Sequence, residues 1–209
     1  MTGPTVTTDA FVLLKHPPAE SFQALVVFSV GHGTMRVLQR VPRRASPQHL
    51  ALDLFDEAAL TLEAGASGTW FIKEVRLLHR PTSIGRRYDT LQAASAFSAL
   101  IARNPVHEES RPAVQQLLRT ALTAFAESDR PDVVGFKSTY CFARDEGHPL
   151  KQQWFPTLPG EERAEVQQLL NQPVAEQILP PERVARLHRR LLEYLRGHTE
   201  IEVGESERG

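Results

Sequence analysis

Hydrophobic residues follow a strand-like pattern through the first 80 residues of the chain. Short runs rich in β-branched and apolar side chains predict five strands, at 5–14, 22–30, 34–41, 50–62 and 69–79. His16-Pro17-Pro18 and Gly31-His32-Gly33 supply the turns after the first two strands. Five short strands without a long helical pattern favour a small closed β-barrel, in which no strand edge is left exposed. The pattern fits an OB-type barrel and an SH3-like barrel equally.

After Arg87 the hydrophobic period becomes helical. Apolar residues at this spacing predict helices at 91–100, 110–125, 131–141, 161–170 and 181–195. The Pro- and Gly-containing stretch 147–160 is expected to be an ordered connector held by Trp154 and Phe155. The fold class is therefore α+β, with an N-terminal five-stranded barrel and a C-terminal α-helical domain. The expected organisation is a barrel domain at 1–82, a helical domain at 83–203 and a disordered tail at 204–209.

Charge is unevenly distributed along a chain whose formal net charge is only −1. Residues 1–87 hold 10 Lys and Arg against 7 Asp and Glu, a net charge of +3, and residues 88–209 hold 14 against 18, a net charge of −4. A local positive surface can therefore exist on a nearly neutral molecule. No apolar run is long enough to cross a bilayer and the first residues do not resemble a signal peptide, so a cytoplasmic protein is expected.

A basic stripe on the third predicted strand is the main candidate binding site. Strand alternation puts Arg36 and Arg40 on one face, and Arg43 and Arg44 continue the charge into the next loop. Arginine suits contact with a phosphate backbone because its guanidinium group donates two parallel hydrogen bonds and also stacks on bases. The alternative is a solvated barrel face whose arginines keep the protein in solution.

A second group of basic residues lies on the last predicted strand and the junction that follows it: Lys73, Arg76, Arg80, Arg86 and Arg87. Strict alternation would place Lys73 and Arg76 on opposite faces, so Arg76, Arg80, Arg86 and Arg87 are the stronger candidates. Some of these arginines could instead bind acidic helix residues such as Asp89 or Glu127.

The aromatic residues of the barrel segment alternate with small or aliphatic residues, in the way typical of a barrel core: Phe22, Phe28, Trp70 and Phe71. This spacing favours burial over an exposed base-stacking role.

Six short motifs are informative in combination: Ala10–Lys15, Glu20-Ser21, His32–Val37, the basic exit Arg43-Arg44, Phe136–Tyr140 and Phe142–Pro149. In these motifs the sequence resembles the bacterial RecO family of DNA recombination mediators. These motifs look like that family's first strand, the Glu-Ser pair before its second strand, its His-Gly turn with the third strand, and the long helix and turn of its second half. The resemblance spans nearly the whole chain and favours the OB-type barrel.

The RecO resemblance implies binding of single-stranded and double-stranded DNA, strand annealing, and cooperation with RecR and the single-stranded-DNA-binding protein through its C-terminal tail. It also adds Lys15, at the end of the first strand, to the expected DNA contacts. Two features depart from the family. The four zinc-binding cysteines of many members are missing, since Cys141 is the chain's only cysteine, and Thr34 replaces the lysine of the turn. We therefore expect no metal and no cofactor.

The sequence gives little support for a catalytic function. Gly31-His32-Gly33 lacks the third glycine and the helix of a phosphate-binding loop, and Cys141, expected to be a buried thiol between Tyr140 and Phe142, is a poor nucleophile even with His148 nearby in sequence. The expected function is therefore DNA binding without catalysis. The main alternative is a protein-interaction adaptor, whose working face is helical and whose barrel has little DNA affinity.

Overall fold

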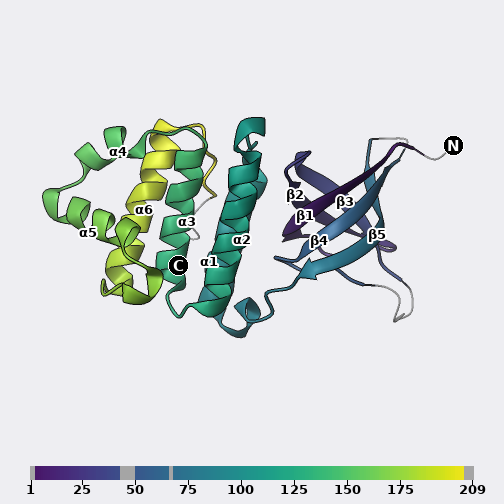
Figure 1. Ribbon diagram of the computed structural model, residues 1–209, viewed down its shortest axis with the longest axis horizontal. Coiled ribbons are helices and arrows are strands. Elements are labelled where there is room, and N and C mark those ends of the chain that lie inside the picture. The colour runs from purple at the N-terminus through teal and green to yellow at the C-terminus, as the bar shows by residue number, and fades with distance from the viewer. Residues whose placement is uncertain (1–2, 43–49, 66–67, 205–209) are drawn as a thin grey trace. The chain divides into compact units, whose positions relative to one another are not determined.

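The computed structural model describes residues 3–42, 50–65 and 68–204. Contacts divide the chain into two compact units, one made of Met1–Pro81 with Pro105–Gln115 and the other of Thr82–Asn104 with Gln116–Gly209. The first unit contains the sheet and the second contains most of the helical residues (Figure 1). The expected tail beyond residue 204 and the arginines at 43 and 44 lie outside the described residues.

The sheet of the first unit is a closed five-stranded barrel. Its strands are β1 (Thr5–Lys15), β2 (Phe22–Ser29), β3 (Gly33–Arg40), β4 (Glu57–Ala64) and β5 (Trp70–His79). They follow the order β1-β2-β3-β5-β4, and β4 pairs with β1 to close the ring. Neighbours are antiparallel except for β3 and β5, which run parallel. This strand order is that of an OB barrel, so the OB-type expectation is confirmed.

The interior of the barrel is filled by alternate residues of its strands, as period-two side-chain alternation requires. The buried cluster comes from β1 to β4 and from Leu52 before β4, and it consists of Ala10, Val12, Leu25, Val27, Val37, Leu52, Ala58, Leu60 and Leu62. Trp70, Ile72 and Val75 of β5 are partly buried and pack against it. Gly33 has a positive φ of 67°, which confirms the need for backbone freedom at the turn between β2 and β3.

The fourth strand begins later than the sequence pattern predicted, at Glu57 instead of residue 50. Leu52 is still fully buried because polar side chains hold its segment in place: the Gln39 side-chain amide donates to the Leu50 carbonyl at 2.8 Å and accepts from the Leu52 amide at 3.0 Å. Side-chain hydrogen bonds thus replace a strand ladder, and the alternating leucines of this segment gave a misleading strand signal.

In the described residues after the barrel there are six α-helices: α1 (Tyr88–Arg103), α2 (Arg111–Glu127), α3 (Pro131–Asp145), α4 (Leu150–Gln153), α5 (Gly160–Asn171) and α6 (Pro181–His198). Figure 1 shows α3 between α1 and α6, and both neighbours pack against it. The connector is ordered as expected, since Trp154 and Phe155 are buried with ring centroids 5.8 Å apart. No helix in the described part of the chain is long and apolar enough to span a membrane.

Candidate nucleic-acid interface

The two arginines of β3 lie on the outer surface of the barrel. Arg36 and Arg40 are exposed, whereas Val37 and Gln39 between them are buried. Within the described residues neither guanidinium group forms an ion pair or a hydrogen bond. Both therefore keep their full charge and their donors for an external anion.

A groove on this outer surface lies beside Arg40. Arg40 is directly opposite Phe22 on β2, and the parallel pair β3–β5 sets Leu38 opposite Phe71. The groove has a volume of about 620 Å³ and is lined by Phe22, Gln39, Arg40, Leu50, Phe71, Ile72, Lys73, Glu74 and Val75. Two basic side chains and two aromatic rings are thus brought together on three adjacent strands.

The aromatic residues of the groove correct an expectation of the sequence. Phe22 and Phe71 are outside the barrel, where their rings meet edge to face at a centroid distance of 5.4 Å, and 36% of Phe22 is exposed. Of the four aromatic residues expected in the barrel core, Trp70 packs against the core cluster, and Phe28 is fully buried but lies opposite Phe11 on the other face of the sheet from Val27. Residue type and spacing could not separate these two pairs, because all four occupy ordinary strand positions.

The turn between β4 and β5 leaves room for the Phe71 ring. A Cβ atom on Gly65 would lie 2.7 Å from Phe71 Cε2 and 3.3 Å from the Thr69 carbonyl oxygen. The absence of a side chain at Gly65 therefore lets the ring rest against the turn. Phe71 is held from two sides, by the glycine backbone and by Phe22, and this limits its motion in the groove.

A bulge in β5 puts Lys73 and Arg76 on the same outer surface. Thr61 pairs with Glu74 and Leu62 pairs with Ile72, so β5 has one extra residue at this point. Ile72 and Val75 pack against the core, and the two residues between them are both exposed. The expectation that Lys73 and Arg76 lie on opposite faces was therefore wrong, because the bulge breaks strict alternation and both are on the outside.

Lys73 also has a partner within the barrel. Its Nζ atom lies 2.7 Å from a carboxylate oxygen of Glu63, although half of the lysine side chain remains exposed. An exposed ion pair of this kind contributes little free energy and exchanges readily for another anion.

Three of the predicted basic contacts are held by carboxylates of their own unit. Lys15 pairs with Asp53 at 3.0 Å, and Arg80 binds the fully buried Asp56 through Nε at 2.7 Å and through Nη2. The hydrogen bonds from Arg80 to Asp56 raise the pKa of the guanidinium group above its ordinary value. Arg87 binds Asp89, one of the acidic residues anticipated for it, and also Asp129 at 2.7 Å. Arg80 therefore stabilises the fold and is not free for a ligand, whereas the ion pairs of Lys15 and Arg87 are partly exposed, as is that of Lys73.

The remaining predicted contacts are Arg76, Arg86, Arg43 and Arg44. Arg76 is exposed on β5 opposite Ala59 of β4 and does not line the groove, and Arg86 is exposed in the helical unit; neither has an ion-pair partner among the described residues. Arg43 and Arg44 lie outside the described residues. Of the nine predicted contacts, Arg40 lines the groove and Arg36 lies on the same strand face.

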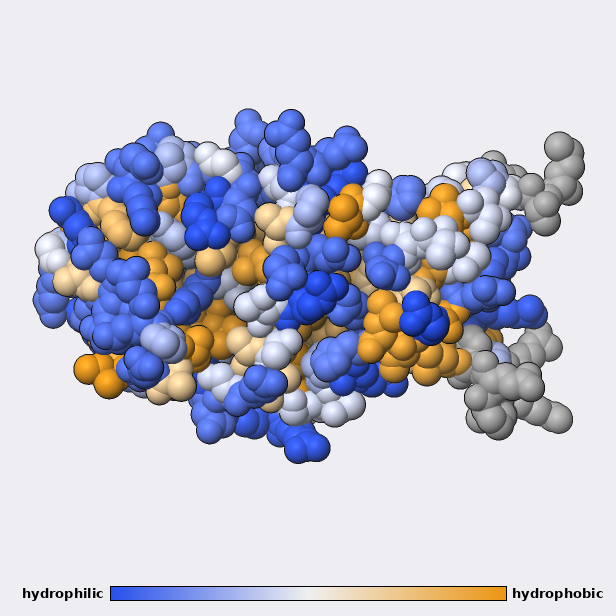
Figure 2. Space-filling view, in the orientation of Figure 1, coloured by the Kyte–Doolittle hydropathy of each residue, from blue (hydrophilic) through white to orange (hydrophobic). Residues whose placement is uncertain are grey.

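The helical unit contains a second groove, of about 910 Å³, between α1, α3 and α6. Ala93, Ala96 and Gly135 give it depth, while His188 and Leu192 of α6 contribute to its lining. Arg103 lies at its rim beside Gly204 and has no ion-pair partner in the described part of the chain. Figure 2 shows hydrophobic residues reaching the surface between hydrophilic ones in both units.

The His188 ring is enclosed beside this second groove. Its Nε2 atom lies 3.1 Å from Thr139 Oγ1, and it meets the Phe136 ring edge to face at 6.1 Å. Burial lowers the pKa of His188 from 6.5 to about 4. The ring is therefore neutral in the folded protein at neutral pH.

We expect this histidine to make the helical unit less stable in mild acid. In the unfolded chain His188 is protonated below about pH 6.5, whereas in the folded chain it stays neutral down to about pH 4. The free energy of unfolding therefore falls as the pH is lowered from 6.5 to 4. The loss is on the order of 2 kcal/mol near pH 4.5. Urea unfolding at pH 7 and at about pH 4.5, followed by helical circular dichroism, measures it. The variant His188→Gln, which cannot titrate, should lose less, and an equal loss in both proteins would contradict this assignment.

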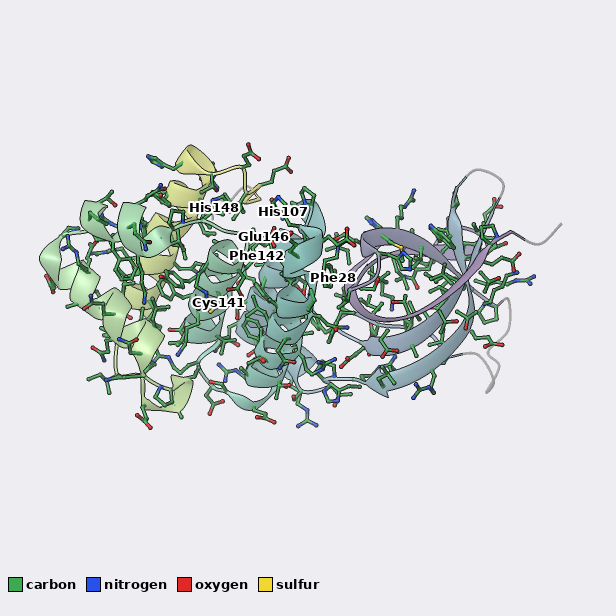
Figure 3. The ribbon with its side chains drawn as sticks, turned by 45° about the horizontal axis from the view of Figure 1, so that its top comes forward. Phe28, His107, Cys141, Phe142, Glu146 and His148 are labelled. Atoms are coloured by element: carbon green, nitrogen blue, oxygen red, sulfur yellow. The ribbon has the colours of Figure 1, made fainter. Side chains whose placement is uncertain are left out.

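Cys141 shows no arrangement typical of a nucleophile. Its thiol is half-buried instead of fully buried as expected, and desolvation raises its pKa. Figure 3 shows Cys141 in the middle of α3 and His148 apart from it, beyond the end of that helix. No cluster of three or more His, Cys, Asp or Glu side chains suited to a metal ion occurs among the described residues.

Comparisons with known proteins found no relative: no protein-family model matches the sequence, and no curated protein is significantly similar to it.

Proposed function

We propose that this protein binds single-stranded DNA on the outer face of its barrel and acts without catalysis, in the manner of a RecO-type recombination mediator. The observation that carries the proposal is the groove in which Phe22 and Phe71 lie beside Arg40 and Lys73. Aromatic rings that stack on bases, together with cations that contact phosphates, are the combination by which OB barrels bind single strands. The barrel topology supports the same use of this face.

The recessed position of the rings favours single strands over duplex. A base can stack on Phe71 only after it has left its own stack, which costs least in a flexible single strand and a few kcal/mol in a duplex. Duplex DNA would instead be held through phosphate contacts alone, with Arg36 and Arg40 as donors. Binding of double-stranded DNA is therefore part of the proposal, at lower affinity.

The RecO resemblance supplies the cellular role within this proposal. Strand annealing and recombinase loading require a protein that holds single strands without reading their sequence, and stacking with phosphate contact has that property. RecR and the single-stranded-DNA-binding protein are the partners that this role implies.

A titration with labelled oligothymidine of about 20 nucleotides tests the proposal, because this length exceeds the roughly 4–16 nucleotides that one OB barrel covers. Fluorescence anisotropy should report binding that weakens as salt rises. Three cationic contacts predict a slope of about −2 for the logarithm of the association constant against the logarithm of salt concentration. A duplex of the same length should bind more weakly. Absence of binding at low salt would rule out the proposal.

A second candidate function is favoured by the groove of the helical unit. Its apolar floor and the unpaired Arg103 at its rim suit a peptide with an apolar end and acidic residues, such as the tail expected of the single-stranded-DNA-binding protein. The adaptor alternative rests on this groove. The test is a titration with a labelled acidic peptide ending in an apolar residue, in which Arg103→Ala should weaken binding; a protein that binds this peptide and no oligonucleotide would be an adaptor.

A further inference from the structure

The segment between α5 and α6 exposes a short apolar run. Ile178 is 83% exposed, Leu179 is partly buried, and Pro180 and Pro181 after it are exposed. A single apolar residue on a protein surface needs no explanation, but a continuous run of them marks a candidate contact surface.

Hydrogen bonds hold the backbone of this run in place. Arg130 donates to the carbonyl of Gln177 at 3.0 Å and to the carbonyl of Leu179 at 2.7 Å, on either side of Ile178. The buried Gln177 side chain donates in turn to the Gln172 carbonyl, at the end of α5, at 3.0 Å. Ile178 is therefore presented to solvent by a fixed backbone.

The backbone of the run is close to the polyproline II conformation. Gln177 has φ −74° and ψ 122°, and Pro180 has φ −59° and ψ 144°. Leu179 precedes a proline, which restricts it to extended conformations as well. Segments with this conformation bind in grooves lined by aromatic rings, and a backbone that is already ordered loses little entropy on binding.

The free charges beside the run are negative. Glu176 and Glu182 lie before and after it, are exposed, and have no ion-pair partner among the described residues. Arg183, the only cation of the segment 173–183, is held by Glu165 at 2.7 Å. The complementary surface is therefore an aromatic-lined groove with positive charge.

The barrel groove has this chemistry. Phe22 and Phe71 line it, Arg40 has no ion-pair partner in the described part of the chain, and the Lys73 side chain is half exposed. Glu74 also lines the groove, and its carboxylate accepts a hydrogen bond from the neighbouring strand at 3.4 Å. Two cations against one carboxylate leave the groove lining with a net charge of +1.

We propose that the segment 173–183 of one copy of this protein binds in the barrel groove of a second copy. Ile178 packs against the two aromatic rings, and the glutamates on either side of the run face the cations of the groove. The contact itself does not require DNA binding. Its consequence rests on the proposed function, because a groove filled by a second copy is closed to a single strand until the strand displaces the segment.

This contact is head-to-tail, since the two surfaces that meet are different. Each copy offers one groove and one segment, so association continues from copy to copy. One segment in one groove buries less than the roughly 1,200 Å² of a stable interface, and we expect a dissociation constant on the order of 100 μM.

Sedimentation equilibrium of the unmodified protein at about 10 to 500 μM tests the contact, and the mean mass should rise with concentration. Ile178→Asp, which brings a carboxylate to the aromatic rings, should stay monomeric. Tyr88→Ser, which removes another exposed side chain of the helical unit, should associate like the unmodified protein. Thermal unfolding should be the same in all three proteins, because neither side chain is buried. A protein that is monomeric throughout this range, or an Ile178→Asp variant that still associates, would overturn the inference.

A mixture of two variants identifies the surfaces that meet. Ile178→Asp keeps the groove, and Arg40→Glu keeps the segment but reverses a charge of the groove, so neither variant should associate alone. Together they offer one intact groove and one intact segment, and association should stop at a dimer of one copy of each. A mixture that stays monomeric contradicts the head-to-tail contact.

Oligothymidine of about 10 nucleotides, short enough to favour one copy per strand, separates this inference from the proposed function. A saturating amount should return the associated protein to monomers. A protein that binds the oligonucleotide and remains associated would place the contact outside the groove, and the inference would fail while the proposed function stands. A protein that forms the mixed dimer but binds no oligonucleotide would support the contact and refute the proposed function.

Discussion

Combining Phe71→Ala with Arg40→Gln and Lys73→Gln should weaken binding of single-stranded DNA by about 100-fold or more. Loss of one stacking ring costs about 1 to 3 kcal/mol per base, and loss of two phosphate contacts removes most of the electrostatic attraction. The three side chains line one groove, so the variant removes its binding chemistry and leaves the core residues in place. Anisotropy titrations at low and moderate salt measure the effect, and the slope against salt should fall from about −2 to about −0.7, the value for one remaining contact.

Arg76→Gln is the matched control for this variant. Arg76 is an exposed arginine of the same barrel without an ion-pair partner in the described residues, and it does not line the groove. Its loss should change affinity less than about three-fold. Similar losses in both proteins would show that binding follows general charge and would contradict the assignment to the groove.

Replacing Asp56 by alanine should have the largest effect on stability. Asp56 is fully buried, accepts two hydrogen bonds from Arg80, and accepts a third from the Asp53 amide at 2.7 Å. Its removal leaves a cation and a backbone donor without their partner, at a cost of about 2 to 4 kcal/mol. This cost is somewhat lower than that of breaking a fully buried ion pair, because about a third of the Arg80 side chain is exposed and its guanidinium group can be hydrated after the substitution.

Urea unfolding of the Asp56→Ala variant measures this cost, and Asp53→Ala provides the comparison. The Lys15–Asp53 pair is partly exposed, so its loss should cost under about 1 kcal/mol. Asp56→Ala should also lower DNA affinity slightly, since Arg80 donates to the Ala51 carbonyl and so holds the segment that includes Leu50 of the groove. Equal stability of the two variants would contradict the structural role assigned to Asp56.

The architecture was predictable because local patterns agreed with it. Five strands with turn residues between them, followed by helical periodicity from Tyr88 onward, correspond to the observed barrel and helices. The pattern failed at residues 50–56, where alternating leucines belong to a segment held by the side chains of Gln39 and Asp56. Hydrogen bonds between residues far apart in sequence leave no periodic signal, so this error could not have been avoided from the pattern alone.

The candidate site was only partly predictable. Alternation correctly placed Arg36 and Arg40 on one face, because β3 is regular. Lys73 and Phe71 were missed as contacts for different reasons: strict alternation separated Lys73 from Arg76, which the bulge brings to the same face, and Phe71 has the composition of a core residue. The partners of Arg80 and Lys15 also depend on tertiary contacts, which charge counting does not include.

The extra residue in β5 has a consequence for how this barrel can vary. Loss of either Lys73 or Glu74 would restore two-residue periodicity through the strand while Ile72 and Val75 kept their inward positions. A single-codon deletion could therefore lower the net charge of the groove by one, through loss of Lys73, or raise it by one, through loss of Glu74, with little disturbance of the interior. At this point the ligand preference of the surface and the integrity of the fold can change independently.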